Sequence, residues 1–278
     1  MKTIKVYFMD GTFKASPSPF AQLFSIHGDL GSTNETNIVV PLAFAFMSHK
    51  SEKAYRIVFE LFKSQIPQWD PKEIHVDYEM ATIKAIKCVF ENATIIGCYF
   101  HYRNCLKRKA TEYNLTSKKH KYIVNLCSTL ALLPDHEINA GWQYIKCNEI
   151  VSGDENLEKF QKYFENFWMR PDFIHIWSVF ANRHRTNNIV EGWNYKINGL
   201  IKKNPTMIQI LHVLHDDNTL ANLKVDQYTR FGKKTLLKRS KKCIETDDFI
   251  RDAQLQLTCG DISTQLFLYK VALFTLSF

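Results

Sequence analysis

The sequence contains no hydrophobic run long enough to span a membrane and no dense set of cysteines. Its most apolar segment, Leu266–Phe278, is shorter than the about 20 residues that a transmembrane helix needs and contains Lys270. The chain has seven cysteines, an odd number, and they are spread widely without a preceding signal peptide. These absences argue against a membrane-spanning protein and against a secreted disulfide scaffold, and they predict a reducing intracellular compartment. We interpret the apolar tail either as a docking strand or as an unreliable end of the gene model.

The composition is that of an ordinary globular protein. Apolar residues make up 45% and charged residues 23% of the 278 residues, enough for one large domain or two small ones. No internal repeat is evident, which argues against a repeat protein. The formal net charge of +8 favours a polyanionic partner such as nucleic acid.

The first hundred residues alternate between strand and helix patterns. β-branched and aromatic runs predict strands, and a period near 3.6 predicts two helices between the last three of them. Ser51 is placed to cap the first helix and Pro67 follows it. The predicted order is β-β-β-α-β-α-β. The predicted strands are Val6–Phe13, Gln22–His27, Ile38–Met47, Glu73–Val76 and Thr94–Phe100.

From about residue 101 to 185 the pattern is helical throughout. Aromatic anchors are expected in its core at Trp142, Phe164, Trp168 and Trp177. A further helix is expected to start at Thr186-Asn187-Asn188. Its buried face should hold Val190, Trp193, Ile197, Leu200 and Ile201, and a separate polar stripe should hold Glu191, Asn194 and Asn198. Past Pro205 we expect a helix to about Leu223, followed by a basic, irregular segment.

Three acids lie at the ends of these elements. Asp10 ends the first strand before Gly11, Asp77 ends the fourth strand, and Glu191 lies in the first turn of the late helix. In a mixed sheet the first and fourth strands can be neighbours, so their acidic ends would meet. Converging carboxylates bind hard cations such as Mg²⁺ or Mn²⁺, and two such ions support an in-line phosphoryl displacement.

Each acid also has a purely structural interpretation. Asp10 before Gly11 fits a turn, and Asp77 fits a helix N-cap, with Glu79 placed at the positive end of that helix. Glu191 lies three residues after Asn188 and fits a capping box. Taken one at a time, these interpretations are favoured over a metal site.

Five sequence blocks together resemble the Mutator-like (MULE) transposase domain. The resemblance runs from about residue 4 to residue 200, with the blocks in the family's order. The blocks are Phe8-Met9-Asp10-Gly11-Thr12-Phe13-Lys14, Val40-Pro41-Leu42-Ala43-Phe44-Ala45-Phe46-Met47, Asp77-Tyr78-Glu79, Gly97-Cys98-Tyr99-Phe100-His101 and Arg185-Thr186-Asn187-Asn188-Ile189-Val190-Glu191-Gly192-Trp193.

The resemblance implies an α/β fold and a set of site residues. The fold is RNase H-like, with a mixed five-stranded sheet flanked by helices and an all-helical insertion before the last acid. The implied catalytic and metal-binding acids of the DDE type are Asp10, Asp77 and Glu191, and the implied supporting residues are Gly11, Glu79, Cys98, His101, Arg185, Asn188 and Trp193. The domains expected are a catalytic core at 1–108 and 185–204, the insertion at 109–184, and a C-terminal helical and basic region at 205–278.

The implied chemistry is DNA cleavage and strand transfer with two Mg²⁺ or Mn²⁺ ions. Water attacks first at the terminal inverted repeats, and the freed 3′-hydroxyl then joins to target DNA. The partners expected are the DNA of the transposon ends and of the target, with a homo-oligomer also compatible and no membrane. The nucleus is the expected location. Cys98-x-x-His101, with Cys105, His175 or His184, is an incomplete zinc pattern, so we disfavour structural zinc.

Two basic stretches are candidates for DNA contact. Lysines and arginines neutralise phosphates without reading the base sequence, although solvated helix faces look the same. The candidates are Lys107, Arg108, Lys109, Lys118 and Lys119, and then Lys238, Arg239, Lys241 and Lys242. The second stretch also fits a nuclear-localisation pattern.

The chain departs from the family in one respect. Relatives commonly carry a zinc-finger DNA-binding domain before the core, whereas Met1 stands only nine residues before Asp10. We therefore expect a truncated or decayed copy, or a core that relies on another subunit. Two other functions stay open, namely a domesticated, non-catalytic DNA-binding or regulatory protein and a structure-selective nuclease.

Overall fold

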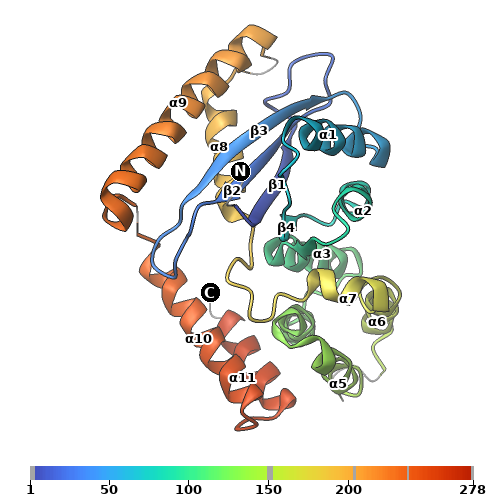
Figure 1. The fold of residues 1–278 in the computed structure, drawn as a ribbon. Coiled ribbons are helices and arrows are strands. Elements are labelled where there is room, and N and C mark those ends of the chain that lie inside the picture. The colour runs from blue at the N-terminus through green and yellow to red at the C-terminus, as the bar shows by residue number, and fades with distance from the viewer. Residues whose placement is uncertain (1–3, 149–152, 203–204, 237, 277–278) are drawn as a thin grey trace. The chain divides into compact units, whose positions relative to one another are not determined.

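The chain forms two compact units in a computed structural model that describes residues 4–148, 153–202, 205–236 and 238–276. Unit 1 consists of Met1–Ile95 and Asn187–Ser240, and unit 2 of Ile96–Thr186 and Lys241–Phe278. Each unit therefore combines two separate stretches of the chain, as the colours of Figure 1 show.

A five-stranded mixed sheet is the centre of unit 1. Its strands are β1 (Val6–Thr12), β2 (Gln22–Asp29), β3 (Val39–Met47), β4 (Glu73–Val76) and β5 (Thr94–Gly97), in the order β3-β2-β1-β4-β5. β1 pairs antiparallel with β2 and parallel with β4, and β2 pairs antiparallel with β3. This topology is consistent with an RNase H-like fold, so the predicted α/β fold class is confirmed.

Helices cover both faces of this sheet. α1 (Glu52–Gln65) and α2 (Met80–Val89) lie on one side, and α8 (Asn188–Leu200) and α9 (Met207–Phe231) on the other (Figure 1). Side chains alternate between the faces of β1. Tyr7 meets the ring of Trp69 with centroids 5.9 Å apart, whereas Phe8 packs with Val190 of α8. The expected Ser51 cap is confirmed, since its side chain accepts a hydrogen bond from the Ala54 amide.

Two expectations for unit 1 are wrong. Leu200 is exposed, at 61%, although its helical position predicts a place on the buried face of that helix. The buried apolar residues are Tyr55 and Phe59 in α1, and Val190 and Ile197 in α8. In both helices the buried face is therefore narrower than the face formed by all apolar residues. α9 continues to Phe231 instead of ending near residue 223, and a short 3₁₀ helix, Gly232–Thr235, follows it.

The regular elements among the described residues of unit 2 are helices, apart from the end of β5, and residues 178–186 are irregular. Its elements are α3 (Tyr99–Glu112), α4 (Lys118–Thr129), a 3₁₀ turn (Leu130–Leu132), α5 (Asp135–Lys146), α6 (Glu155–Phe167), α7 (Pro171–Trp177), α10 (Lys241–Thr258) and α11 (Thr264–Leu276). In the described part of the chain, no helix is long and apolar enough to cross a membrane.

Aromatic rings form the core of unit 2. Trp168 and Trp177 are fully buried, and the Trp177 indole donates a hydrogen bond to the Trp168 carbonyl at 2.7 Å. Tyr102 stacks on Trp177 with centroids 5.2 Å apart, and Trp142 stacks on Phe164 at 4.6 Å. The predicted aromatic anchors are therefore confirmed.

Two segments of unit 2 differ from the sequence-based expectations. β5 ends at Gly97, and Tyr99 already begins α3, so the strand predicted through Phe100 is three residues too long. The tail, predicted as a docking strand, is the helix α11. Its buried residues Phe267, Leu268, Val271 and Ala272 are spaced by one and three, which is one face of a helix and not of a strand.

Candidate active site

Asp10 and Asp77 occupy matching positions on two neighbouring parallel strands. The register of β1 and β4 pairs Val6 with Glu73 and Phe8 with His75, an offset of 67 residues. Since 77 − 10 is also 67, Asp77 follows β4 at the level of Asp10. Adjacent strands lie about 4.8 Å apart, so the two backbones are neighbours there. The expectation that the first and fourth strands lie side by side is confirmed.

The Asp10 carboxylate is held from two sides. Its Oδ1 accepts a hydrogen bond from the Gly11 amide at 2.8 Å, and its Oδ2 accepts one from Asn194 Nδ2 of α8, also at 2.8 Å. One turn further along α8, the Asn198 side chain bonds to the Thr12 hydroxyl at 2.9 Å. The polar stripe predicted for α8 therefore lies against β1.

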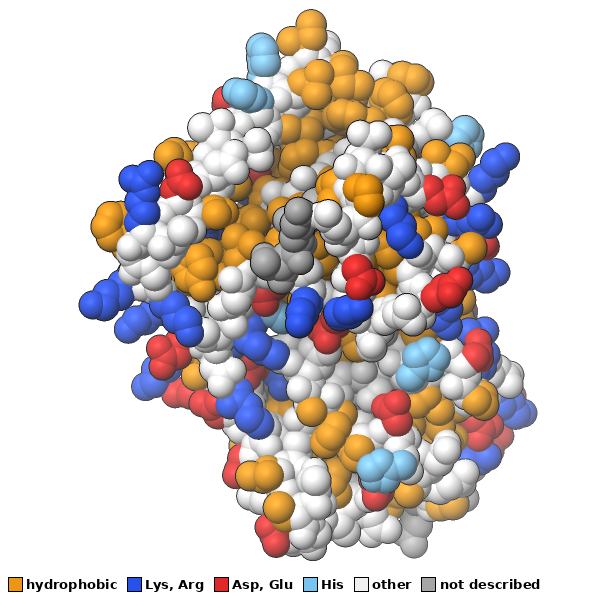
Figure 2. Space-filling model, viewed as in Figure 1, with side chains coloured by type: hydrophobic (Ala, Val, Ile, Leu, Met, Phe, Trp, Pro, Cys, Tyr) orange, Lys and Arg blue, Asp and Glu red, His pale blue; other side chains and the backbone are white. Residues whose placement is uncertain are grey.

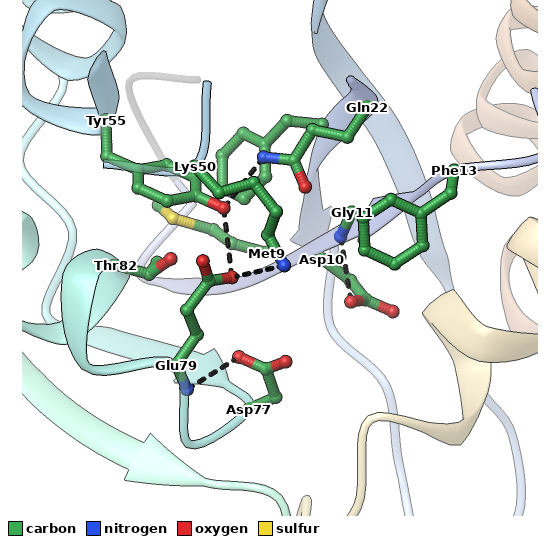
Figure 3. Close-up of a pocket in the computed structure, with 11 residues that line it drawn as sticks. Met9, Asp10, Gly11, Phe13, Gln22, Lys50, Tyr55, Asp77, Glu79 and Thr82 are labelled. Atoms are coloured by element: carbon green, nitrogen blue, oxygen red, sulfur yellow. Dashed lines mark hydrogen bonds and ion pairs between the residues drawn. The ribbon is translucent and has the colours of Figure 1, made fainter. Parts of the chain in front are cut away.

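A small pocket joins the two acids to side chains from α1, β2 and the start of α2 (Figure 3). The Asp77 Oδ1 accepts a hydrogen bond from the Glu79 amide at 3.1 Å. Glu79 Oε2 in turn accepts one from the Tyr55 hydroxyl at 3.0 Å and forms an ion pair with Lys50 at 3.1 Å. Glu79 is thus neutralised by its own partners, and Asp10 and Asp77 are the acids that the pocket offers to a cation.

Tyr55 anchors this network in the core. Its hydroxyl also accepts a hydrogen bond from the Gln22 amide at 2.7 Å. Burial raises the pKa of Tyr55 well above its ordinary value, so the hydroxyl keeps its proton and remains a donor to Glu79. Neither Gln22, Tyr55 nor Lys50 carries a recognisable motif, and sequence reasoning missed all three.

Glu191 lies half-buried in the first turn of α8. It precedes Asn194 by three residues, which places both on the stripe that meets β1, on the side of the sheet where Asn194 binds Asp10. Among the described residues, however, Asp10, Asp77 and Glu191 do not form a group whose ligand atoms all lie within 4.8 Å of one another. The structure therefore brings Asp10 and Asp77 together and places Glu191 on the adjoining helix.

The helix N-terminus does not use the predicted capping box. The N-cap residue is Asn187, whose side chain makes no capping hydrogen bond, and Asn188 is the exposed first residue of the helix. The Glu191 amide instead donates to the Asn187 carbonyl at 3.0 Å. The interpretation of Glu191 as a capping-box residue is therefore wrong.

Trp193 fastens α8 to α9 and to β2. Its indole donates to buried Asp217 of α9 at 2.7 Å, and Lys196 pairs with the same carboxylate at 2.6 Å. The ring meets His27 of β2 edge-on at 4.9 Å. Burial lowers the pKa of His27 to about 3, against the opposing effect of Asp217, so this ring is neutral at physiological pH.

The remaining predicted residues lie in unit 2 or near the end of α9. Cys98 is the buried N-cap of α3, and its Sγ lies within 4.8 Å of a ring nitrogen of His101. Arg185 forms an ion pair with Asp247, and its carbonyl accepts the Tyr99 amide at 2.8 Å.

Some of the basic residues predicted to contact DNA are bonded to other parts of the protein, and others are exposed. Lys109 pairs with Glu112 at 2.7 Å, and the Arg239 side chain donates to the Asn34 carbonyl at 2.9 Å. The exposed candidates are Lys107, Arg108, Lys118, Lys119, Lys238, Lys241 and Lys242.

Gly11 is required by close packing rather than by a turn, because β1 continues through Thr12. A Cβ at position 11 would lie 2.4 Å from Gln22 Oε1 and 3.1 Å from its Cδ. Gln22 is buried and bonded to Tyr55, so it cannot move without breaking that hydrogen bond. The interpretation of Asp10-Gly11 as a turn is therefore wrong.

We expect Gly11→Ala to lower the free energy of unfolding by about 1–3 kcal/mol, because it overpacks this contact. Urea denaturation followed by circular dichroism measures it. Gly192→Ala is the matched control, since a Cβ there meets nothing within 4 Å and Ala favours a helix. Equal stability of wild type and Gly11→Ala would contradict the packing argument.

The donor set at this edge of the sheet suits a hard divalent cation. Asp10 and Asp77 offer oxygen ligands only, and carboxylate oxygens are the ligands that Mg²⁺ and Mn²⁺ prefer. The hydrogen bonds from Gly11, Asn194 and Glu79 fix the orientation of both carboxylates. The residues present therefore fit a Mg²⁺ or Mn²⁺ site.

Comparison with known families gives one match. The model of the MULE transposase domain matches residues 6–104, which include the first four of the five sequence blocks. The family resemblance is thereby confirmed over this range, and the block around Glu191 lies outside it. No curated protein sequence matches the chain.

Proposed function

Residues 6–104 match the MULE transposase domain, and on this premise we propose that the chain is the catalytic domain of a MULE-type DNA transposase. The proposed reaction is metal-dependent DNA cleavage at the element ends, followed by transfer of the freed 3′-hydroxyl to target DNA. The observation that supports it best is the shared 67-residue offset, which sets Asp77 at the level of Asp10.

We assign the metal-binding role to Asp10, Asp77 and Glu191. Mg²⁺ or Mn²⁺ ions held there would activate the attacking oxygen and stabilise the leaving one. Asn194 and the Gly11 amide orient Asp10, and the Glu79 amide orients Asp77. Lys50 lies at the same pocket, where it pairs with Glu79 and lies over the ring of Phe13.

The wider assignments belong to the same proposal. The catalytic core would consist of residues 1–108 and 185–204, the insertion of 109–184 and the C-terminal region of 205–278. Basic side chains that would contact DNA phosphates gather over the C-terminal part of α9 and the segment after it, at the left of Figure 2. Lys224, Arg230, Lys233, Lys234 and Lys238 lie in this region. The proposed location is the nucleus, where the DNA substrate is found.

Removal of divalent metal tests the function directly. We expect the protein to convert supercoiled plasmid to the nicked form in Mg²⁺ or Mn²⁺ and to lose this activity in EDTA, with recovery when metal is restored. Gel electrophoresis of the plasmid measures it.

Metal-independent nicking would contradict the proposed mechanism. Tight DNA binding without nicking in either metal would instead support a domesticated, non-catalytic protein with the same fold. A filter-binding assay in Ca²⁺ supplies that second measurement.

A further inference from the structure

Unit 2 contains a second pocket, of about 580 Å³, in the described residues between α3, α4 and the end of α11. This volume lies in the range of small-molecule sites. Ala110, Leu115 and Val124 form an apolar part of its lining, beside the polar side chains of Thr111, Asn125, Ser128 and Thr275. A pocket of this kind could accept the uncharged part of a ligand of moderate size.

Three cations and no acid line this pocket. They are Arg103 and Lys107 of α3 and Lys121 of α4. None of the three forms an ion pair with an acid among the described residues, and acids near in sequence or space have other partners. Glu112 pairs with Lys109 at 2.7 Å, and Asp154 with His120 at 2.8 Å. The pocket is therefore a concentration of uncompensated positive charge.

The Arg103 side chain has a hydrogen-bond donor that a ligand could use. Its Nε is buried and has no hydrogen-bond partner in the described structure, and its guanidinium lies over the Tyr99 ring, 5.7 Å from the centroid. A buried donor without an acceptor destabilises a fold by about 1–3 kcal/mol unless something accepts from it. Burial lowers the pKa of Lys107, and the nearby positive charge of Arg103 lowers it further.

We propose that this pocket binds a phosphorylated ligand of nucleotide size. Arg103, Lys107 and Lys121 would hold its phosphate groups. Ala110, Leu115 and Val124 would contact the uncharged part of the ligand. Arginine and lysine are the side chains that bind phosphate in proteins, and an apolar wall beside them favours a base or other flat ring over an inorganic ion. The same chemistry is offered by a free nucleotide and by the end of a DNA strand.

The proposal does not depend on the transposase assignment, because the pocket shares no residue with the pocket at Asp10 and Asp77. Its test is a binding measurement on the full chain, so a failure to cut DNA leaves it unaffected. Fluorescence anisotropy is measured in EDTA with two labelled probes, a nucleoside triphosphate and a 5′-phosphorylated single-stranded oligonucleotide. Binding of the triphosphate points to a free nucleotide, and binding of the oligonucleotide alone points to DNA.

Two kinds of variant separate the pocket from general charge. Arg103→Gln and Lys121→Gln should each weaken binding about tenfold, because each removes a charge-assisted hydrogen bond. Thr111→Trp should weaken it as much by filling the pocket, with every cation kept. Lys162→Gln, at an exposed lysine of α6, is the control for charge and should change the Kd less than twofold.

The binding measurements on these variants either support or overturn the proposed site. Selective loss in the pocket variants, with circular dichroism unchanged, supports the site. If Arg103→Gln fails to fold, Lys121→Gln and Thr111→Trp decide the question, since both residues lie at the surface. Binding of neither probe, or equal weakening by Lys162→Gln and the pocket variants, would overturn the proposal.

Discussion

Asp77→Asn is expected to slow metal-dependent DNA nicking by about a hundredfold or more, while the melting temperature stays close to that of wild type. The substitution removes the negative charge that would bind the cation. A hundredfold loss of rate is the size of effect that follows removal of one group that stabilises developing charge. The fold should survive, because the asparagine Oδ1 can still accept the hydrogen bond that Asp77 accepts from the Glu79 amide. Plasmid nicking measures the rate, and thermal unfolding measures stability.

Asp70→Asn is the control for this substitution. Asp70 is an exposed acid ahead of β4, with an ion pair to Lys72 at 2.5 Å and no place in the pocket. Exposed ion pairs contribute about 0–1 kcal/mol, so neither activity nor stability should change much. Nicking by Asp77→Asn at the wild-type rate would remove Asp77 from the proposed metal site.

Glu191→Gln is expected to reduce nicking to a similar extent with only a small loss of stability. Glutamine has the same shape but binds divalent ions poorly, so the third proposed ligand is lost. The helix should be little affected, because its N-cap is Asn187 and no capping box depends on Glu191. Loss of a negative charge near a helix N-terminus costs about 0.3–1 kcal/mol.

A matched control exists in α1. Glu52 is also an acid in the first turn of a helix, and it has no role in the proposed metal site. Glu52→Gln should cost as much stability as Glu191→Gln and leave nicking unchanged. A large fall in melting temperature for Glu191→Gln alone would instead assign Glu191 a structural role.

The sequence predicts the sheet well because its signals are local. The strands alternate or run apolar for several residues, and short connections between the first three predict the antiparallel order found in β1, β2 and β3. The same reasoning places Asp77 directly after β4, as the structure shows, whereas Asp10, predicted at the end of the first strand, lies within β1, which continues through Thr12. The sequence does not give the register between β1 and β4. That register is what places Asp10 and Asp77 at the same level of the sheet.

Contacts made across the fold are harder to predict. The polar stripe of α8 is visible in the sequence, yet nothing local says that the Asn194 side chain reaches Asp10. Leu200 was assigned to the buried face because it is apolar, whereas burial depends on what packs opposite. For the tail, the helical spacing of Phe267, Leu268, Val271 and Ala272 was available in the sequence and outweighs the strand interpretation.

The interleaving of the two units has a consequence for biosynthesis. A ribosome releases β1, β2 and β3 long before α8 and α9, which belong to the same unit. Until residues 190–214 emerge, the sheet face that carries Phe8, Leu23 and Phe44 has no partner from its own chain. The nascent polypeptide therefore exposes an apolar face of the sheet until α8 and α9 have been synthesised. Exposed apolar surface of this kind favours aggregation and binding by chaperones.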